Sequence, residues 1–126
     1  MGKYSKGADY ERELIQLFKN KNFAAVRVAG SGRARMEQPD ILASNGEIIL
    51  GIESKYSGSD YKTIVKEEVN ALVTFCKQFG CIPVLAFRFP HTEWKFMIIE
   101  TMINENVSIK KTTTLMTMDE IIKSFQ

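Results

Sequence analysis

Residues 82–89 form a nearly continuous apolar run, Ile-Pro-Val-Leu-Ala-Phe-Arg-Phe. A strand with this pattern is typical of a sheet that is buried on both faces. A partner strand is predicted at 94–100, across a turn at 89–93. Because a sheet of this kind needs other elements on each side, the run favours a fold in which helices pack on a central sheet.

Three segments have the apolar spacing of amphipathic helices. Apolar residues recur at intervals of about one turn along 9–21 and again along 62–79. Gly80 follows the second segment, at the position where a glycine often ends a helix. A third, shorter helix is predicted at 118–125. These helices are candidates for the layers on the sheet.

Further short strands are predicted at 23–28, 40–43 and 47–55. Asn45-Gly46, between the last two, is a strong signal for a hairpin with a tight turn. The polar stretches 56–62 and 104–117 are taken as connections. The predicted order is α-β-β-β-α-β-β-α, so we expect the α/β class, with a mixed sheet flanked by helices in one domain over residues 1–126.

Composition limits the class of protein. Hydrophobic residues make up 44% and charged residues 25%, as in ordinary soluble globular proteins. The net charge is +2, from 17 Lys and Arg against 15 Asp and Glu, so any nucleic-acid contact must be a local patch. Residues 1–14 contain no apolar segment like that of a secretory signal, and no apolar run is long enough to span a bilayer. We therefore expect a cytoplasmic, nucleoid-associated protein with no membrane partner. Cys76 and Cys81 lack a zinc spacing and are expected to pack as reduced thiols.

Two sequential strands carry the residues that suggest chemistry. Pro39-Asp40 opens one of them, and Glu53-Ser54-Lys55 ends the other, with Glu53 13 positions after Asp40. The hairpin brings Asp40 and Glu53 to one end of the sheet, and alternation places Glu53 and Lys55 on the same face. Two carboxylates, together with a backbone carbonyl such as that of Ser54, are ligands that Mg²⁺ prefers.

This set of residues meets the needs of phosphodiester hydrolysis. Metal ions polarise the phosphoryl group and lower the pKa of a bound water, and an ammonium such as that of Lys55 orients the nucleophile. A metal-dependent nuclease is therefore the favoured interpretation. The structural alternative is that Asp40 begins a strand, while Glu53 and Lys55 form an ordinary surface ion pair.

The helix predicted at 9–21 adds a second set. Glu11 borders the apolar stripe and is a candidate third acidic ligand, if it faces the sheet end where Asp40 and Glu53 meet. The alternative is a solvated charge that complements the helix dipole. Basic residues near these motifs indicate either a phosphate-binding face or a solvated loop. They are Lys3, Lys6, Arg12, Arg27, Arg33, Arg35 and Lys55.

Together these motifs resemble the archaeal-type Holliday junction resolvases of the PD-(D/E)XK nuclease superfamily. The resemblance rests on Lys6-Gly7-x-x-x-Glu11-Arg12-Glu13-Leu14, Phe23 to Arg27 with Ala29-Gly30-Ser31, Pro39-Asp40-Ile41, Ile52-Glu53-Ser54-Lys55, Phe75…Phe79-Gly80-x-x-Pro83-Val84-Leu85-Ala86 and Trp94-Lys95-Phe96. It implies a restriction-endonuclease-like fold. It also implies a structure-selective endonuclease that cuts four-way junctions by paired symmetric nicks leaving 5′ phosphates, in homologous recombination and DNA repair.

The resemblance assigns residue roles as well. The implied catalytic residues are Glu11, Arg12, Ser31, Asp40, Glu53 and Lys55. The implied metal site has one or two Mg²⁺ ions, replaceable by Mn²⁺, and no small-molecule cofactor; its ligands are Glu11, Asp40, Glu53 and Ser54. The implied DNA contacts are Lys3, Lys6, Arg12, Arg27, Ser31, Arg33 and Arg35.

The family's two-fold dimer matches a symmetric substrate with two identical sites. Phe75 and Phe79, four positions apart on one predicted helix, resemble the aromatic dimer contact, and burial in the monomer's own core is the equal alternative. Two other functions remain open. One is a PD-(D/E)XK nuclease that acts on duplex or damaged DNA, and the other is a DNA-binding module without catalytic activity.

Overall fold

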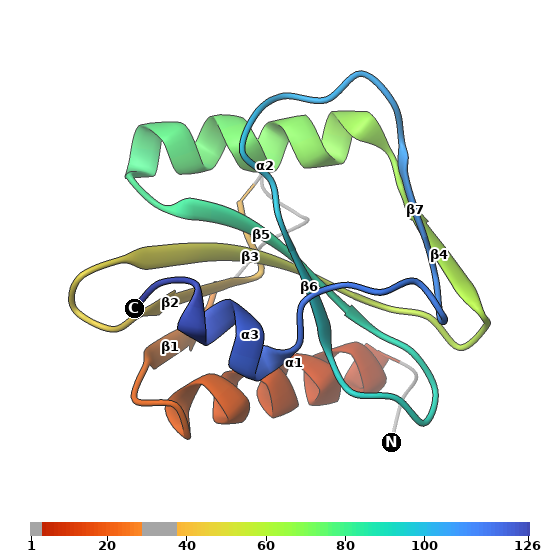
Figure 1. The fold of residues 1–126 in the computed structure, drawn as a ribbon, viewed down its shortest axis with the longest axis horizontal. Helices are drawn as coiled ribbons and strands as arrows, with labels where there is room; N and C mark the ends of the chain where they lie inside the picture. Colours follow the sequence, from red (N-terminus) through yellow and green to blue (C-terminus); the bar gives the residue numbers. More distant parts are fainter. Residues whose placement is uncertain (1–3, 29–37) are drawn as a thin grey trace.

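A computed structural model describes residues 4–28 and 38–126, with side chains from residue 7 onward. A central sheet lies between two layers of helices (Figure 1). Helix α2 (Lys66–Phe79) covers one face, and helices α1 (Tyr4–Lys19) and α3 (Met118–Lys123) cover the other. The predicted α/β class is therefore confirmed.

The central sheet has five strands in the order β1-β2-β3-β5-β6. Their bounds are β1 (Ala24–Arg27), β2 (Ile41–Ser44), β3 (Ile49–Tyr56), β5 (Ile82–Arg88) and β6 (Lys95–Ile98). β3 and β5 are parallel, and all the other neighbours in this sheet are antiparallel. Parallel neighbours need a crossover, and α2 lies on that crossover. The sheet is therefore mixed, as predicted.

The predicted element order was wrong in one respect, because it lacked two strands: 107–110 had been assigned to a connection, and 61–64 to the end of a connection and the start of the helix predicted at 62–79. β4 (Tyr61–Ile64) pairs antiparallel with β7 (Val107–Lys110) in a separate two-stranded ribbon. The side chains of Thr63 and Ser108, 45 residues apart, share a hydrogen bond of 2.9 Å. Each strand is short and half polar, and only its long-range partner makes it a strand.

Helix and strand ends also differ from the prediction. α2 begins at Lys66 instead of residue 62, because Val65 is extended and the Asn106 side chain accepts a hydrogen bond from the Lys66 amide. It ends as predicted, with Gly80 in the left-handed conformation at φ 91°. The β2–β3 connection is a four-residue loop, since Ser44 pairs with Ile49.

The core consists of two apolar clusters, one on each face of the sheet. The cluster under α1 includes Leu14 and Phe18, and the cluster under α2 includes Val69 and Cys76. β5 contributes to both, because Val84 and Ala86 face α1 whereas Leu85 and Phe87 face α2, and all four are fully buried. The two-sided burial predicted from the apolar run is confirmed.

Cys76 and Cys81 are free and buried, as expected. Both sulfur atoms pack against Gly51 of β3, at the α2 face of the sheet. Within the part of the chain that the structure describes, no helix is long and apolar enough to cross a membrane.

Candidate active site

The predicted chemistry lies at the open end of the β2–β3 hairpin. Asp40 immediately precedes β2, where its amide donates to the Ile52 carbonyl at 2.8 Å and its carbonyl accepts from the Val28 amide at 2.8 Å. β3 continues from Glu53 to Tyr56 beside β5, past the last residue pair of its ladder with β2. The sheet thus forms a step at which the side chains of Asp40, Glu53 and Lys55 are only partly buried.

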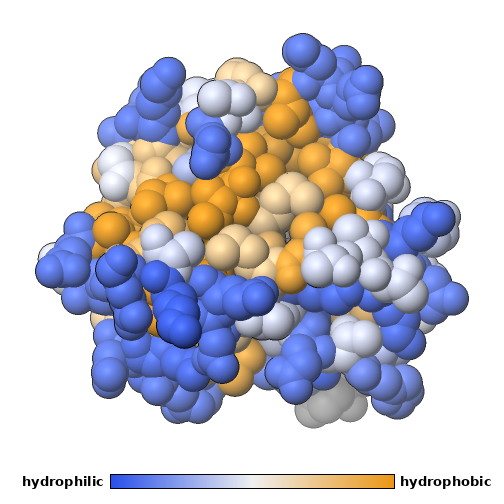
Figure 2. All heavy atoms as spheres, viewed as in Figure 1, coloured by the Kyte–Doolittle hydropathy of each residue, from blue (hydrophilic) through white to orange (hydrophobic). Residues whose placement is uncertain are grey.

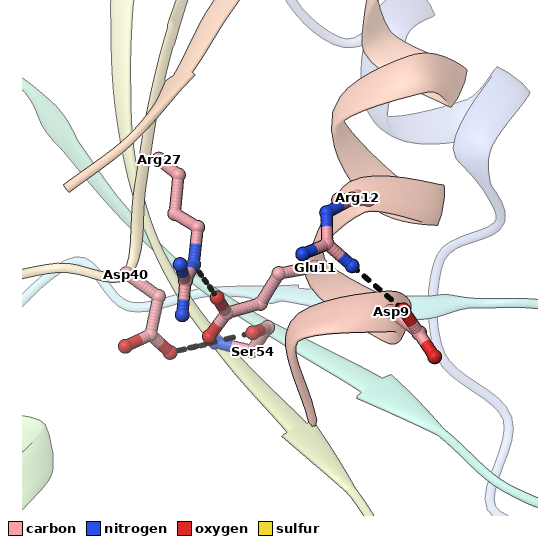
Figure 3. A network of polar contacts seen from close by, with 6 residues as sticks. All are labelled: Asp9, Glu11, Arg12, Arg27, Asp40 and Ser54. Carbon is pink, nitrogen blue, oxygen red and sulfur yellow. Dashed lines mark hydrogen bonds and ion pairs between the residues drawn. The ribbon is translucent and has the colours of Figure 1, made fainter. Parts of the chain in front are cut away.

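Asp40 is fixed at this step by Ser54. Its Oδ2 atom accepts from the Ser54 amide at 2.9 Å and from the Ser54 hydroxyl at 3.3 Å (Figure 3). The sequence interpretation gave Ser54 a role through its backbone carbonyl. The contacts seen here use the amide and the hydroxyl instead, and they orient the Asp40 carboxylate.

Glu11 reaches the same region from α1, as predicted. Its Oε1 atom accepts from Arg27 Nε at 2.5 Å, and its side chain is only 18% exposed. Arg27 lies at the end of β1, and its guanidinium extends toward Glu11 and Asp40 (Figure 3). Two layers of the fold therefore meet here, because Glu11 comes from a helix whereas Asp40 and Arg27 come from the sheet.

Arg12 lies elsewhere on α1. Its guanidinium contacts the Asp9 carboxylate at 2.6 Å, and both side chains are about two-thirds exposed (Figure 3). The structure therefore places Arg12 at the exposed side of the helix.

The α2 face of β3 carries the other part of the site. Lys55 Nζ lies 3.5 Å from Glu53 Oε2 and 2.5 Å from Glu68 Oε2. The alternation prediction that Glu53 and Lys55 share a face agrees with this geometry. Glu68, in the first turn of α2, was missed, because an acidic residue there is also what a helix dipole favours. One sequence signal was available: Glu68 directly precedes Val69, which is buried against the sheet, so Glu68 lies at the border of the helix face that packs on the sheet.

The electrostatics of this cluster favour a neutral Glu53. Burial, a hydrogen bond with Glu68 and the nearby Asp40 charge raise the pKa of Glu53 to about 9, against the opposing effect of Lys55. For Glu68, burial raises the pKa, but hydrogen bonds with Glu53 and Lys55 outweigh it and lower the pKa. The proton shared by the two acids therefore resides on Glu53 at neutral pH.

Lys55 stays charged in the same cluster. Burial lowers the pKa of its ammonium, but the hydrogen bond to Glu68 and the charges of Glu53, Glu68 and Asp40 together raise that pKa above its ordinary value. An ammonium is thus present at the site across the physiological pH range.

The predicted carboxylates are not arranged as a ready-made metal cluster. Among the described residues, no group of three or more His, Cys, Asp and Glu side chains is placed to hold an ion. The donors nevertheless fit a divalent cation, since they are all hard oxygen atoms. Burial is the largest cause that raises the pKa of Glu53, with the Glu68 hydrogen bond and the Asp40 charge next, and a cation bound there would favour the ionised carboxylate.

Five predicted residues are not placed by the structure. Lys3, Ser31, Arg33 and Arg35 lie outside the described residues, and the side chain of Lys6 does too. Their roles in DNA binding, and that of Ser31 in catalysis, stay predictions.

The two aromatic residues of α2 stack on one another. The rings of Phe75 and Phe79 have centroids 5.3 Å apart at an interplanar angle of 16°. Phe75 is partly buried against the core, whereas the side chain of Phe79 is 51% exposed. Phe79 is therefore not buried in the monomer's own core, which was the alternative to a dimer contact.

A mixed sheet covered by helices on both faces, with Asp40, Glu53 and Lys55 at one open end, has the arrangement expected of PD-(D/E)XK nucleases. The chain belongs to the archaeal Holliday junction resolvase family (Hjc), whose model matches residues 2–126. This confirms the resemblance seen in the sequence.

Similar proteins agree with this assignment. The crossover junction endodeoxyribonuclease Hjc of Archaeoglobus fulgidus is 38% identical over 78% of this chain and 72% of its own length. The Hjc of Methanocaldococcus jannaschii is 37% identical over 69% of this chain and 62% of its own length. A solved structure of the A. fulgidus Hjc superposes with a TM-score of 0.84 at 31% identity, over 94% of this chain and 99% of that one.

The enzyme class that follows is that of a crossover junction endodeoxyribonuclease, as the sequence predicted. Nucleases of this family generally depend on a metal ion. The comparisons thus establish the fold and the enzyme class.

Proposed function

We propose that this protein resolves four-way DNA junctions by paired symmetric nicks that leave 5′ phosphates, in homologous recombination and DNA repair. The observation that carries the proposal is the convergence of Asp40, Glu53 and Lys55 at the open end of the β2–β3 hairpin, in a chain of the resolvase family. We further propose that residues 1–126 act as one nuclease domain in the cytoplasm, associated with the nucleoid.

The proposed cation is Mg²⁺, with Mn²⁺ as a substitute, in one or two copies held by Asp40, Glu53, Glu11 and the Ser54 carbonyl. Bound there, it would supply Lewis-acid stabilisation of the charge that develops on the phosphoryl oxygens. Ser54 keeps the Asp40 carboxylate turned toward the site. Lys55 orients the attacking water for in-line displacement of the 3′ oxygen, so the phosphate stays on the 5′ end of the product.

Arg27 and Arg12 support the proposal of a DNA-binding face. Their side chains are 54% and 65% exposed. β1 carries Arg27 beside the proposed active site, and α1 carries Arg12 on its exposed side (Figure 3). Guanidinium groups at such a rim bind phosphates without reading bases, as recognition of junction shape requires. Lys3, Lys6, Ser31, Arg33 and Arg35 are proposed to extend this face.

A homodimer is proposed on the basis of the apolar surface. The exposed ring of Phe79 stacks on Phe75 at the C-terminal end of α2. Figure 2 shows apolar side chains gathered in the middle of one face. A surface of this kind is typical of an interface between copies of a chain, and two copies would present two active sites to opposed strands.

The proposal is tested by cleavage of a labelled, immobile four-way junction and of the matching linear duplex, each with Mg²⁺ or with chelator. We expect paired symmetric nicks in the junction only, in the presence of Mg²⁺. D40N should reduce cleavage to background and keep junction binding, because phosphate contacts dominate the affinity.

Each other outcome would contradict part of the proposal. Equal cleavage of the duplex would indicate a general nuclease. Binding without cleavage at any metal concentration would indicate a DNA-binding module. Full activity of D40N would remove Asp40 from the metal site.

A further inference from the structure

Helix α2 supplies a carboxylate that the sequence motifs did not include. Glu68 Oε2 lies 2.5 Å from Lys55 Nζ, whereas Glu53 Oε2 lies 3.5 Å from the same atom. The ammonium is therefore held more closely by Glu68 than by the acidic partner within its own strand. α2 begins only two residues before Glu68, so the contact joins the start of a helix to the end of β3.

The surroundings give this contact a defined geometry. The side chains of Lys55 and Glu68 are 24% and 28% exposed, so the pair is largely shielded from solvent. Glu68 also shares a hydrogen bond with Glu53, and the charge of Lys62 on β4 acts on it. The next residue, Val69, is fully buried and anchors this turn of α2 to the sheet. A charged hydrogen bond fixed in this way restrains both partners, unlike an exposed surface ion pair.

We propose that Glu68 is a positioning residue for cleavage, which holds the Lys55 ammonium at the edge of the site where the scissile phosphate and the attacking water must lie. The inference rests on the proposed function and adds a residue to its site. A lysine ammonium is a point charge on a flexible four-carbon stem, with three rotatable donors. Glu68 takes one donor and fixes the stem, which leaves donor capacity for the substrate.

The test compares E68Q with E67Q, which removes the same charge from the exposed neighbouring residue in the same helical turn. Single-turnover cleavage of a four-way junction at saturating enzyme and Mg²⁺ gives the cutting rate, and titration in chelator gives the junction Kd. We expect E68Q to lower the rate ~10- to 100-fold, as misplacement of a reacting group does. Its junction Kd should stay that of the wild type, and E67Q should match the wild type in both.

E68D is the conservative variant, since it keeps a negative charge within reach of Lys55. It should recover part of the rate that E68Q loses. Thermal unfolding of each variant, measured beside the kinetics, separates positioning from folding. A variant that only destabilises the fold has a lower unfolding temperature but cuts at the wild-type rate once it is folded and saturating.

Several results would overturn the inference. These are a wild-type rate for E68Q, an equal loss in E67Q, no recovery in E68D, or restoration of E68Q by higher Mg²⁺, which would make Glu68 a metal ligand. The outcome for the proposed function is distinguishable. A wild-type protein that cuts no junction contradicts that function, whereas a wild type that cuts no faster than E68Q contradicts only the role of Glu68.

Discussion

At Glu53, a carboxyl group is buried beside two other acidic side chains, Asp40 and Glu68, with the Lys55 ammonium on the opposing side. Burial is the largest cause that raises its pKa to about 9, so the metal-free protein carries a neutral Glu53 at neutral pH. A cation bound at this edge would favour the ionised form. The charged form of Glu53, which burial disfavours, is therefore the form that a bound metal ion would stabilise.

This arrangement predicts a pH dependence of stability in chelator. An unfolded Glu has an ordinary pKa of 4.5, so between pH 4.5 and about 9 the unfolded chain has lost a proton that the folded protein keeps. The free energy of unfolding of the wild type should fall with rising pH through this group, by at most about 1.4 kcal/mol per pH unit. E53Q cannot ionise at this position. The free energy of unfolding of E53Q minus that of the wild type should therefore rise with pH up to about 9 and then level off.

Urea unfolding of both proteins from pH 5 to pH 10 checks this prediction. E47Q, changed at the exposed β2–β3 loop, is the control and should follow the wild type. Parallel curves for E53Q and the wild type would show that Glu53 is not the buried neutral acid described here.

At the scale of elements, the site depends on how closely α2 packs on β3. Gly51 lies on the α2 face of β3, two residues before Glu53. A Cβ atom at Gly51 would lie 2.5 Å from the Cys76 sulfur and 2.9 Å from the Cys81 sulfur. Real Cβ atoms do not approach so closely, so the glycine allows the C-terminal part of α2 to rest on the sheet. The first turn of the same helix carries Glu68, whose Oε2 atom lies 2.5 Å from Lys55 Nζ of β3.

G51A should therefore destabilise the fold by overpacking, by roughly 1–3 kcal/mol. Removal of the nearer sulfur should relieve the clash, so the cost of G51A in a C76A background should be smaller, by roughly 0.5–3 kcal/mol. Urea unfolding of the two single variants and the double variant measures this coupling.

G46A is the matched control for that cycle. Gly46 has φ 94° and open space around its α-carbon, so its substitution strains the backbone without a clash. C76A should not relieve the cost of G46A. An equal cost of G51A in both backgrounds would show that α2 does not rest on Gly51.

At the scale of the whole molecule, the active site and the exposed aromatic surface lie at different ends of α2. Glu68 is in its first turn, whereas Phe79 is its last residue. A partner on the Phe79 side would leave the Asp40–Lys55 edge open to DNA. The proposed dimer is therefore compatible with two accessible active sites.

F79A should weaken this dimer, because a half-exposed aromatic ring is a typical interface anchor. Sedimentation velocity in the absence of DNA should show a dimer for the wild type and a shift toward monomer for F79A. The free energy of dimer dissociation should be lower for F79A than for the wild type by roughly 2 kcal/mol. V26A, at a side chain that is 58% exposed on β1, should keep the wild-type behaviour. A monomeric wild type, or equal effects of both variants, would contradict the assignment of α2 as the interface.

The sequence by itself was sufficient where the physical cause is local. The apolar run along β5 predicted burial on both faces, Gly80 predicted the end of α2, and Asn45-Gly46 predicted the hairpin. Because alternation and the hairpin are local rules, they also placed Asp40, Glu53 and Lys55 at one end of the sheet. The family followed from the same motifs.

The tertiary structure decided what depends on contacts between distant residues. β4 and β7 are strands only because they pair across 45 residues, and Glu11 faces the site as the partner of Arg27 in another layer. Glu68 joins the site because α2 packs its first turn against β3. The local pattern offers only candidates for such contacts, because the contacts themselves arise from burial and charge in the folded chain. For the same reason the neutral state of Glu53 belongs to the fold and not to its motif.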